Sequence, residues 1–550
     1  MHLMSSPDAI DRRTWATWSA GLLVAAIGLY LHRRLWTFTC DDAYISFRYA
    51  RNLAEFGALT FDVGHVPPVE GYTNFLWVVL LAAGMGIGIA PELCASVLGF
   101  LSGLAILGFV FALVTSAPIG GRGGGDSSRG GTADARGRLV ASRRCGALCV
   151  GMLLATPMFV VWTSGGLETS TATLFVLGAV FAGINGRLRA AALLSVLGVL
   201  TRPDAVVPLT GAALGCLLSG QRHARPRGSK LAHALLIFVV PLVVHMCWRR
   251  WVYDAWLPHT WEVKRHGASL ARSHGAQYLW VWGRDLGLMW WLPLAVLLRR
   301  RHLVLVVPVV ASVGYVVSVG GDFMAYGRFL QTGLVLLVCL VGWLATDISR
   351  RVGGRAWTQW RGPIALASLA VLLGASGSRL LVKDRASAWQ DGMFESVAAM
   401  DRFARVRVAA GEWMRANLPS DLLVSVGAAG AMPYASGLSV VDTYGLVERD
   451  LSGFRAPDTG TKARPGHQLR ATLEYVKSRE PDLLCHLGYA GPQIPPTREA
   501  RRRGRGDYRW ACIPVGEIAL PLEQQGLQDV GTYCCLRRES QIVGPFGGTR

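Results

Sequence analysis

The sequence predicts an α-helical protein that crosses a membrane many times and carries an α/β domain at its C-terminal end. Two observations predict the membrane part. The 550 residues are 51% hydrophobic and only 17% charged, and apolar runs long enough to cross a bilayer recur between residues 17 and 382. A third observation predicts the C-terminal domain, because strand-like and helical runs alternate in a more polar chain after residue 382.

The apolar runs number about eleven or twelve, and short arginine-rich links separate them. They cover residues 17–34, 74–90, 95–116, 146–163, 168–184, 190–201, 205–219, 231–247, 283–298, 303–319, 329–347 and 363–382. The first run ends in His32-Arg33-Arg34, and no small-residue cleavage site follows it. We therefore interpret this run as a retained helix and not as a cleaved signal peptide.

Arginine distribution predicts the orientation of the helices, because cytoplasmic loops collect Lys and Arg. The Gly/Arg-rich stretch 117–144 holds six arginines against two aspartates and is expected to be a flexible cytoplasmic loop. Further cytoplasmic links are expected at residues 187–189, 222–230, 299–301 and 350–361. Residues 164–168, 201–204, 248–282 and 320–322, and everything after 382, then lie outside. This order requires either an odd number of crossings or a re-entrant segment within 74–116, and the sequence leaves both open.

The net charge of +20 fits the same picture. Arginines gather on the cytoplasmic side of membrane proteins and against lipid phosphates. No nucleic-acid-binding motif accompanies the charge, so membrane lipids are expected partners and nucleic acid is not. The expected location is the cytoplasmic (inner) membrane, with multiple spans and an extracytoplasmic C-terminal domain.

The chain divides into a membrane part, residues 1–382, with a first external loop at 35–73, and an α/β domain at 383–550. Strands are expected at Leu422–Val426, Leu438–Val441 and Asp482–His486, with a helix at Gln468–Lys477. The cysteines expected outside are Cys40, Cys485, Cys512, Cys534 and Cys535. An oxidising compartment permits disulfides among them, and their odd number leaves at least one thiol unpaired. No CxxC pair with metal spacing is present, so zinc is not expected.

Asp41 and Asp42 stand where the first apolar run meets water, a costly position for carboxylates that is typical of functional sites. Polar residues follow them at helical spacings of four, three and four: Tyr44, Arg48, Arg51 and Glu55. This spacing predicts a short helix with one polar face at the membrane surface. The residues alone leave two other interpretations open, in which Asp42 caps the helix and the arginines contact lipid headgroups.

Several stretches, in order along the chain, resemble motifs of GT-C membrane glycosyltransferases, and most closely the terminal arabinofuranosyltransferase (AftB-like) family of actinobacterial cell-wall synthesis. Asp41–Asn52 with Val69–Trp77 resembles the first external loop of that family. Later stretches resemble its "GLET", "TRP-acid", "LPNTxxxK" and "GGDFM…R" motifs: Ser164–Thr169, Leu200–Asp204, Trp256–Lys264 and Gly320–Arg328. His259 stands where the third of these has Asn. Val426–Asp442 is similar to the start of the family's external C-terminal domain.

The resemblance implies that a sugar moves from a polyprenyl-phosphate carrier to an acceptor hydroxyl on a glycan, lipid or protein outside the membrane. Asp41 or Asp42 would take the acceptor proton, and Asp41 is preferred because Asp42 directly precedes the helix. Cations would stabilise the departing lipid phosphate, and the candidates are Arg48, Arg51, Arg202, Lys264 and Arg328. The other motif positions expected at the substrate site are Glu70, Glu168, Asp204, His259 and Asp322. Neither the sugar nor the acceptor follows from the residues.

Alternatives remain open for several of these groups. Asp41 and Asp42 are suited to bind Mg²⁺ or Mn²⁺, although no metal is required by the proposed chemistry. Arg202 and Arg328 are also placed to snorkel at span ends, and His259 and His266 to form interfacial hydrogen bonds, bind metal or act as bases. The run Arg501–Arg505 is expected to be a solvated loop, with contact to an anionic acceptor as the alternative. The competing functions are a transporter or flippase of a lipid-linked sugar and a non-catalytic scaffold.

Overall fold

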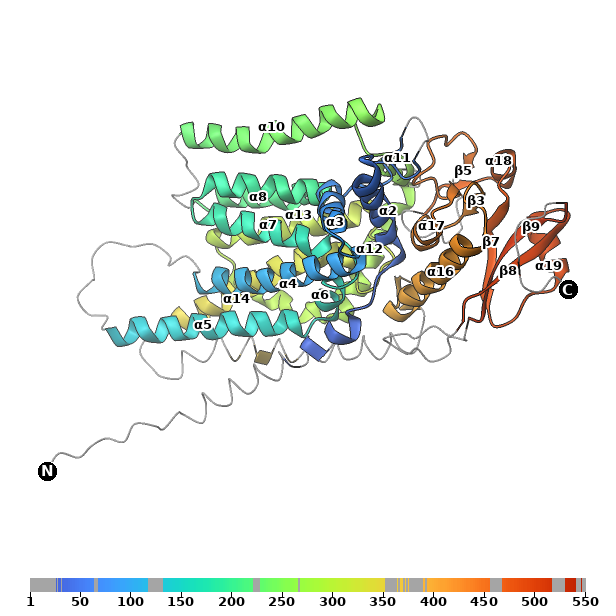
Figure 1. Cartoon of the computed structure of the whole chain (residues 1–550). Coiled ribbons are helices and arrows are strands. Elements are labelled where there is room, and N and C mark those ends of the chain that lie inside the picture. The colour runs from blue at the N-terminus through green and yellow to red at the C-terminus, as the bar shows by residue number, and fades with distance from the viewer. Residues whose placement is uncertain are drawn as a thin grey trace.

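The computed structural model describes residues 26, 28–30, 32–63, 68–116, 132–220, 228–265, 268–351, 364, 367–368, 371, 374, 389–390, 393–455, 467–516, 530–540 and 546. Several predictions fall outside these residues. They concern the first apolar run before residue 26, the loop residues 117–131, the link 221–227, His266, the link 352–361 and most of the run 363–382. Within the described residues, the structure confirms the predicted class, an apolar helical bundle followed by an α/β region (Figure 1).

The bundle consists mainly of apolar helices. They are α3 (Phe75–Gly86), α4 (Pro91–Thr115), α5 (Thr132–Leu154), α6 (Pro157–Trp162), α7 (Thr169–Ile184), α8 (Leu188–Thr201), α9 (Val206–Leu218), α10 (Gly228–Tyr253), α13 (Leu303–Val319) and α14 (Gln331–Arg351). Among the described residues, four helical segments are long and apolar enough to cross a membrane: Pro91–Thr115, Gly228–Tyr253, Arg300–Val319 and Arg328–Ile348. Four shorter apolar helices accompany them. The chain is therefore a multi-pass membrane protein.

Two segments differ from the prediction. Residues 132–144, expected within a flexible loop, form the first turns of α5 instead. Their Ala, Arg and Leu residues favour helix, and the helix continues directly into the apolar run that follows. The run 283–298 is a 3₁₀ segment, η3 (Leu288–Leu297), and not an α-helix. The larger rise of a 3₁₀ helix, about 2 Å per residue, lets ten residues cover roughly 20 Å.

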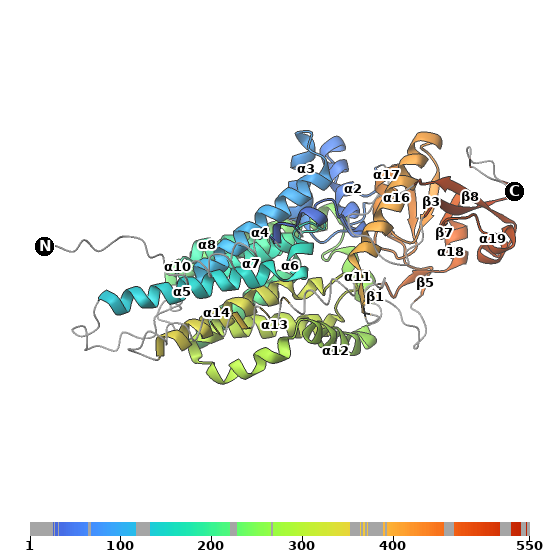
Figure 2. The same ribbon diagram turned by 90° about the horizontal axis from the view of Figure 1, so that it is seen from below.

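Helices α3 and α4 share one end of the bundle. Asn74, which precedes α3, contacts Glu168, and Glu92 in the first turn of α4 lines a pocket with Asp401 of the C-terminal part. Both helices therefore begin at the same end of the bundle, close to α2 (Asp41–Phe56) (Figures 1 and 2).

The C-terminal part is built on a five-stranded sheet in the order β4-β3-β7-β9-β8. The predicted strands are confirmed as β3 (Leu423–Val426), β4 (Ser439–Asp442) and β7 (Leu483–Gly491), and they are parallel to one another. The other two strands, β8 (Tyr508–Pro514) and β9 (Thr532–Arg538), are antiparallel. The main helices are α16 (Val397–Asn417), α17 (Ala431–Ser436), α18 (Leu473–Ser478) and α19 (Thr497–Gly504). The predicted helix at 468–477 is confirmed only in its second half, because β6 (Arg470–Ala471) precedes α18.

Two disulfides join the antiparallel strands of this sheet. Cys485 pairs with Cys535, and Cys512 pairs with Cys534. Cys535 links β9 to β7, and Cys534 links β9 to β8. Adjacent residues of a strand point to opposite faces of the sheet, so the two disulfides lie on opposite faces. Cys40, the fifth cysteine expected outside, is a buried free thiol.

The predicted arginine loop at 501–505 lies largely on helix α19 and is not a loop. Its side chains pair with acidic neighbours on the surface. Arg501 contacts Glu539, and Arg502 and Arg503 both contact Glu499, each at 2.8 Å. This run is therefore largely neutralised within its own domain.

Candidate active site

The acidic pair is positioned by the turn at residues 164–168. The backbone N–H of Cys40 donates to the carbonyl of Gly165 at 3.3 Å. Gly166 has φ +82°, and a Cβ on it would lie 2.8 Å from Ala43 of α2, so a side chain here would push the helix away. Helix α2 begins at Asp41 with Cys40 as its N-cap residue. The interpretation of Asp42 as the cap was therefore wrong by two positions.

The Asp41 carboxylate faces the C-terminal part of the chain. It accepts a hydrogen bond from the backbone N–H of Ala431, at 3.1 Å, in the first turn of α17. A Cβ on Gly430 would overlap with Asp41, so this contact depends on glycine. Burial raises the pKa of Asp41 to about 6, opposed by Arg407 and the bonds from α17. Asp41 thus joins α2 to the C-terminal part.

Asp42 is the freer of the two carboxylates. Among the described residues it has no hydrogen-bond or ion-pair partner, and it is partly exposed in a cleft. Its charge raises the pKa of Lys264, which burial lowers. Lys264 lies on α11 (His259–Arg265), and its side chain is solvent-accessible although protein surrounds it, as expected for a group that lines a cavity. The amine has no ion-pair partner within the described residues and is available to a ligand.

A buried polar chain leads from α2 to the end of α8. Asn74 donates to Glu168 at 2.9 Å and also bonds to Ser46 of α2. Arg202 lies 3.5 Å from Glu168 and binds both oxygens of Asp204, at 3.0 and 2.7 Å. Two carboxylates therefore neutralise the charge of Arg202. Its main role is to hold these side chains in place, and little of its charge is left for a ligand.

Arg328 provides a second available cation. Its Nε donates to Asp322 at 3.1 Å, and Tyr278 donates to the other oxygen of that carboxylate at 2.9 Å. The guanidinium lies over the rings of Trp162 and Phe329, at 5.5 and 5.2 Å. The terminal nitrogens of Arg328 make no hydrogen bond to the residues described here. They remain free to bind an anion, and their charge lowers the pKa of nearby Lys264.

Below these cations an apolar groove enters the bundle between α7, α9 and α13. It is narrow and open to solvent. Arg202, Asp204 and Arg328 border it, and its walls combine apolar residues with Thr169, Ser312 and Thr332. We name this space the apolar groove and the set Arg202, Lys264 and Arg328 the cation cluster. An apolar groove with a cationic end suits a lipid chain with an anionic head.

On the other side of Asp42 lies a larger cleft of about 1290 Å³, open to solvent. The residues that border it include Asp41, Asp42, Arg407, Tyr444, Arg470 and His486. We name it the sheet-edge cleft, because its far wall follows the carboxyl ends of β3 and β4. Asp42 borders this cleft and also acts electrostatically on the cation cluster.

The structure places Arg48 and Arg51, predicted as phosphate ligands, in contacts with other segments of the chain. Arg48 is only 3% exposed. Its guanidinium donates to the carbonyls of Phe61, Pro433 and Leu438 at 2.7–2.9 Å and pairs with Asp62. Arg51 donates to the carbonyl of Tyr434 at 3.0 Å and lies over its ring. Helix α2 therefore docks against the C-terminal part through these arginines, and its polar face does not lie free on a membrane surface.

Glu70 and His259 also lie apart from the cation cluster. Glu70 pairs with Arg249 of α10 at 2.6 Å and is buried, which raises its pKa. His259 bonds to the carbonyl of Gly445 at 3.0 Å, and burial lowers its pKa. Both are contacts between elements, and their predicted part in substrate binding stays a prediction.

The described residues contain no group of three or more His, Cys, Asp or Glu side chains placed to hold a metal ion. Asp41 is engaged by α17, and Lys264 lies near Asp42. Binding of Mg²⁺ or Mn²⁺ by this pair stays a prediction from the sequence.

Sequence reasoning missed three residues that shape the site. Tyr278 holds Asp322, Trp162 packs under Arg328, and Asn74 holds Glu168. Asn74 closes the Val69–Trp77 stretch and carried a signal, since an amide before an apolar run is costly to bury without a partner. Tyr278 and Trp162 stand in aromatic-rich segments with no signal of their own.

Residues 398–528 match a family model described as a domain of unknown function (DUF8728). No curated protein sequence matches the chain. Among solved structures, the chain is similar to "ArnT from Cupriavidus metallidurans bound to Undecaprenyl phosphate", with a TM-score of 0.48 and 12% identity over 94% of this chain and 98% of that one. The same protein in the apo state gives a TM-score of 0.47 and 13% identity, covering 78% and 86%.

Proposed function

We propose that this chain is a membrane glycosyltransferase of GT-C type that moves a sugar from a polyprenyl-phosphate carrier to an acceptor hydroxyl. The observation that carries the proposal is the position of Asp42. It is a carboxylate without a described partner, it borders the sheet-edge cleft, and its charge acts on Lys264 of the cation cluster. One carboxylate is thus shared by a site for an anionic lipid and a site for a second substrate.

The donor is expected to lie with its polyprenyl chain in the apolar groove and its phosphate against Lys264 and Arg328. As the bond between the anomeric carbon and the phosphate oxygen breaks, negative charge grows on that oxygen. Cations held in place before the reaction stabilise this charge without reorganising. Arg202, which Glu168 and Asp204 hold in place, keeps the cation cluster ordered.

Asp42 accepts the proton of the acceptor hydroxyl as the oxygen attacks the anomeric carbon. The products are the glycosylated acceptor and the free polyprenyl phosphate. We assign this role to Asp42 over Asp41, the residue preferred from the sequence, because the Asp41 carboxylate is engaged by Ala431. Arabinofuranose remains the proposed sugar only through the resemblance of the motifs to the AftB-like family.

The disulfides support a C-terminal domain that lies outside the cytoplasm, attached to a bundle in the cell membrane. Stable disulfides form in oxidising compartments outside the cytoplasm, and both bonds lie in this domain. Helices α2 and α11, which carry Asp42 and Lys264, lie at the end of the bundle next to this domain (Figure 2). Transfer is therefore proposed at the outer face.

The test is donor turnover by the full-length protein purified in lipid nanodiscs. A panel of polyprenyl-phosphate sugars, arabinofuranose included, is incubated with cell-envelope extract, and release of polyprenyl phosphate is measured by mass spectrometry. Wild type is expected to release it, and Lys264→Gln to release it at least about tenfold more slowly. A flippase would move the lipid-linked sugar across the bilayer without breaking its phosphate bond, and that result would replace the proposal.

A further inference from the structure

We infer that the sheet-edge cleft selects an acceptor sugar that carries an anionic group, a carboxylate or a phosphate ester, and that Arg470 is the residue that binds this group. The inference rests on the proposed function, because it names the second substrate of the same site. Four observations on the cleft support it.

The first observation is the position of the cleft in the fold. Val426, Gly427 and Ala428 follow β3, and Tyr444 follows β4, so the cleft lies at the carboxyl ends of parallel strands. This edge is where open α/β sheets bind ligands. Asp42 borders the same cleft. A molecule bound along this edge would therefore extend from the sheet to the carboxylate.

The second observation is the state of Arg470. Its guanidinium lies over the ring of Tyr444 at 5.2 Å, and its side chain is exposed in the cleft. Within the described residues it makes no hydrogen bond and no ion pair. Tyr444 packs edge-on against His467 at 4.8 Å, and His467 packs against Phe323 at 5.0 Å. The aromatic stack orients a guanidinium whose donors are free, which suits bidentate binding of a carboxylate or phosphate.

The third observation is the distribution of charge. Arg407 of α16 also borders the cleft, donates only to the carbonyl of Phe403 at 3.2 Å, and has no ion-pair partner within the described residues. The carboxylates of the cleft are Asp41, Asp42 and Glu395. Both unpaired arginines belong to the C-terminal part, as Glu395 does, whereas the acidic pair belongs to α2. Arg407 acts on Asp41, so Arg470 is the arginine left to hold the anionic group of a sugar while a hydroxyl meets Asp42.

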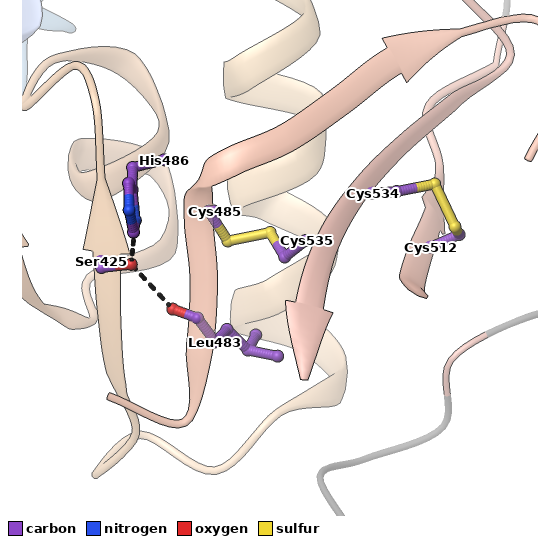
Figure 3. The surroundings of a disulfide bond; sticks show 7 residues. All are labelled: Ser425, Leu483, Cys485, His486, Cys512, Cys534 and Cys535. Atoms are coloured by element: carbon purple, nitrogen blue, oxygen red, sulfur yellow. Dashed lines mark hydrogen bonds between the residues drawn. A yellow bond between two sulfur atoms is a disulfide. The ribbon is translucent and has the colours of Figure 1, made fainter. Parts of the chain in front are cut away.

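The fourth observation concerns His486, which provides a contact for sugar hydroxyls. Ser425 contacts Nδ1 of His486 at 2.7 Å and donates to the carbonyl of Leu483 at 3.3 Å (Figure 3). Burial lowers the pKa of His486 to about 4, so the ring is neutral at pH 7, and Nε2 makes no hydrogen bond within the described residues. The disulfide between Cys485 and Cys535 fixes the adjacent backbone (Figure 3). The partly exposed ring of Tyr489 also borders the cleft.

The experiment measures binding of defined sugars to the full-length protein in nanodiscs, without donor. The probes are an oligosaccharide ending in glucuronate, the same oligosaccharide ending in glucose, glucose 6-phosphate and inorganic phosphate. Wild type is expected to bind the anionic sugars at least about tenfold more tightly than the neutral one. Arg470→Gln should abolish this difference. Arg509→Gln, which removes an exposed arginine of the same domain from a pair with Glu539, is the matched control and should leave it unchanged.

Each outcome decides the inference. Equal binding of glucuronate-ended and glucose-ended probes by wild type overturns it, and so does an anion preference that survives in Arg470→Gln. If inorganic phosphate binds as tightly as glucose 6-phosphate, the sugar does not contribute to binding, and the inference that the cleft selects a sugar is overturned. If Arg470→Gln does not fold, Arg407→Gln takes its place and is expected to reduce the preference severalfold. Because these measurements need no donor, donor turnover by wild type is scored separately, and failure of the acceptor subsite is distinguishable from failure of the proposed function.

Discussion

Replacement of Asp42 by Asn separates the chemistry from the fold. The two side chains have nearly the same shape, but the amide does not accept a proton at neutral pH. Because Asp42 has no partner within the described residues, the change breaks no bond that the structure shows there. The free energy of unfolding is therefore expected to change by less than about 0.5 kcal/mol. The rate of transfer should fall roughly 100- to 10,000-fold, the usual contribution of a general base.

Asp41→Asn is the matched comparison, one residue away. Its amide oxygen still accepts from Ala431, whereas the loss of charge weakens that bond and the attraction to Arg407. The net effect of burial and these contacts is a raised pKa, so the fold disfavours the charge of Asp41, and the neutral amide should not lower the free energy of unfolding at pH 7. We expect its transfer rate to stay within about tenfold of wild type. The two variants thus differ in transfer rate, which only Asp42→Asn lowers strongly.

The assay is transfer from a polyprenyl-phosphate sugar by each purified variant, together with its thermal unfolding curve. Donor binding, measured separately, should be unchanged in Asp42→Asn because the cation cluster is intact. Two results would refute the reasoning. Full activity of Asp42→Asn would remove the base, and a folded Asp41→Asn variant as slow as Asp42→Asn would return the role to the residue preferred from the sequence.

Three further predictions follow from individual contacts. Lys264→Gln should raise the donor Kd about tenfold or more while Lys264→Arg retains most of the affinity, as calorimetry with undecaprenyl phosphate would show. Arg48→Gln should lower the free energy of unfolding by about 3 to 5 kcal/mol, because it leaves Asp62 and three carbonyls without their buried partner. The affinity of the folded protein for the donor should not change. A selective loss of donor binding would show that Arg48 belongs to the donor site. Burial raises the pKa of Asp41 to about 6, so folding favours the protonated carboxyl. This contribution to the free energy of unfolding is fully present below about pH 4 and is lost as the pH rises through 6. Wild type should therefore lose Tm relative to Asp41→Asn between pH 4 and 7, and parallel curves would contradict this.

Much of the site was predictable because each motif carries its own local signal. Glu168, Arg202, Asp204, Asp322 and Arg328 stand at the ends of apolar runs, and such ends meet at one face of a bundle. The structure places all five around the cation cluster. The residues that the structure places away from the cation cluster are of the same types and have similar local sequence patterns. Arg48 and Glu70 also stand beside apolar runs, but their partners, Pro433 and Arg249, lie far along the chain.

The sequence by itself determined the class of the protein, the positions of most apolar helices, the strands β3, β4 and β7, and the acidic pair. These features depend on hydrophobic periodicity and on residue type within short segments. Only the tertiary structure decided which aspartate remains free, which arginines remain available, and that the sheet edge faces Asp42. Those outcomes depend on contacts between distant segments, such as Asp41 with Ala431 and Arg470 with Tyr444. A side chain is free only when no distant group reaches it, and local sequence carries no record of that.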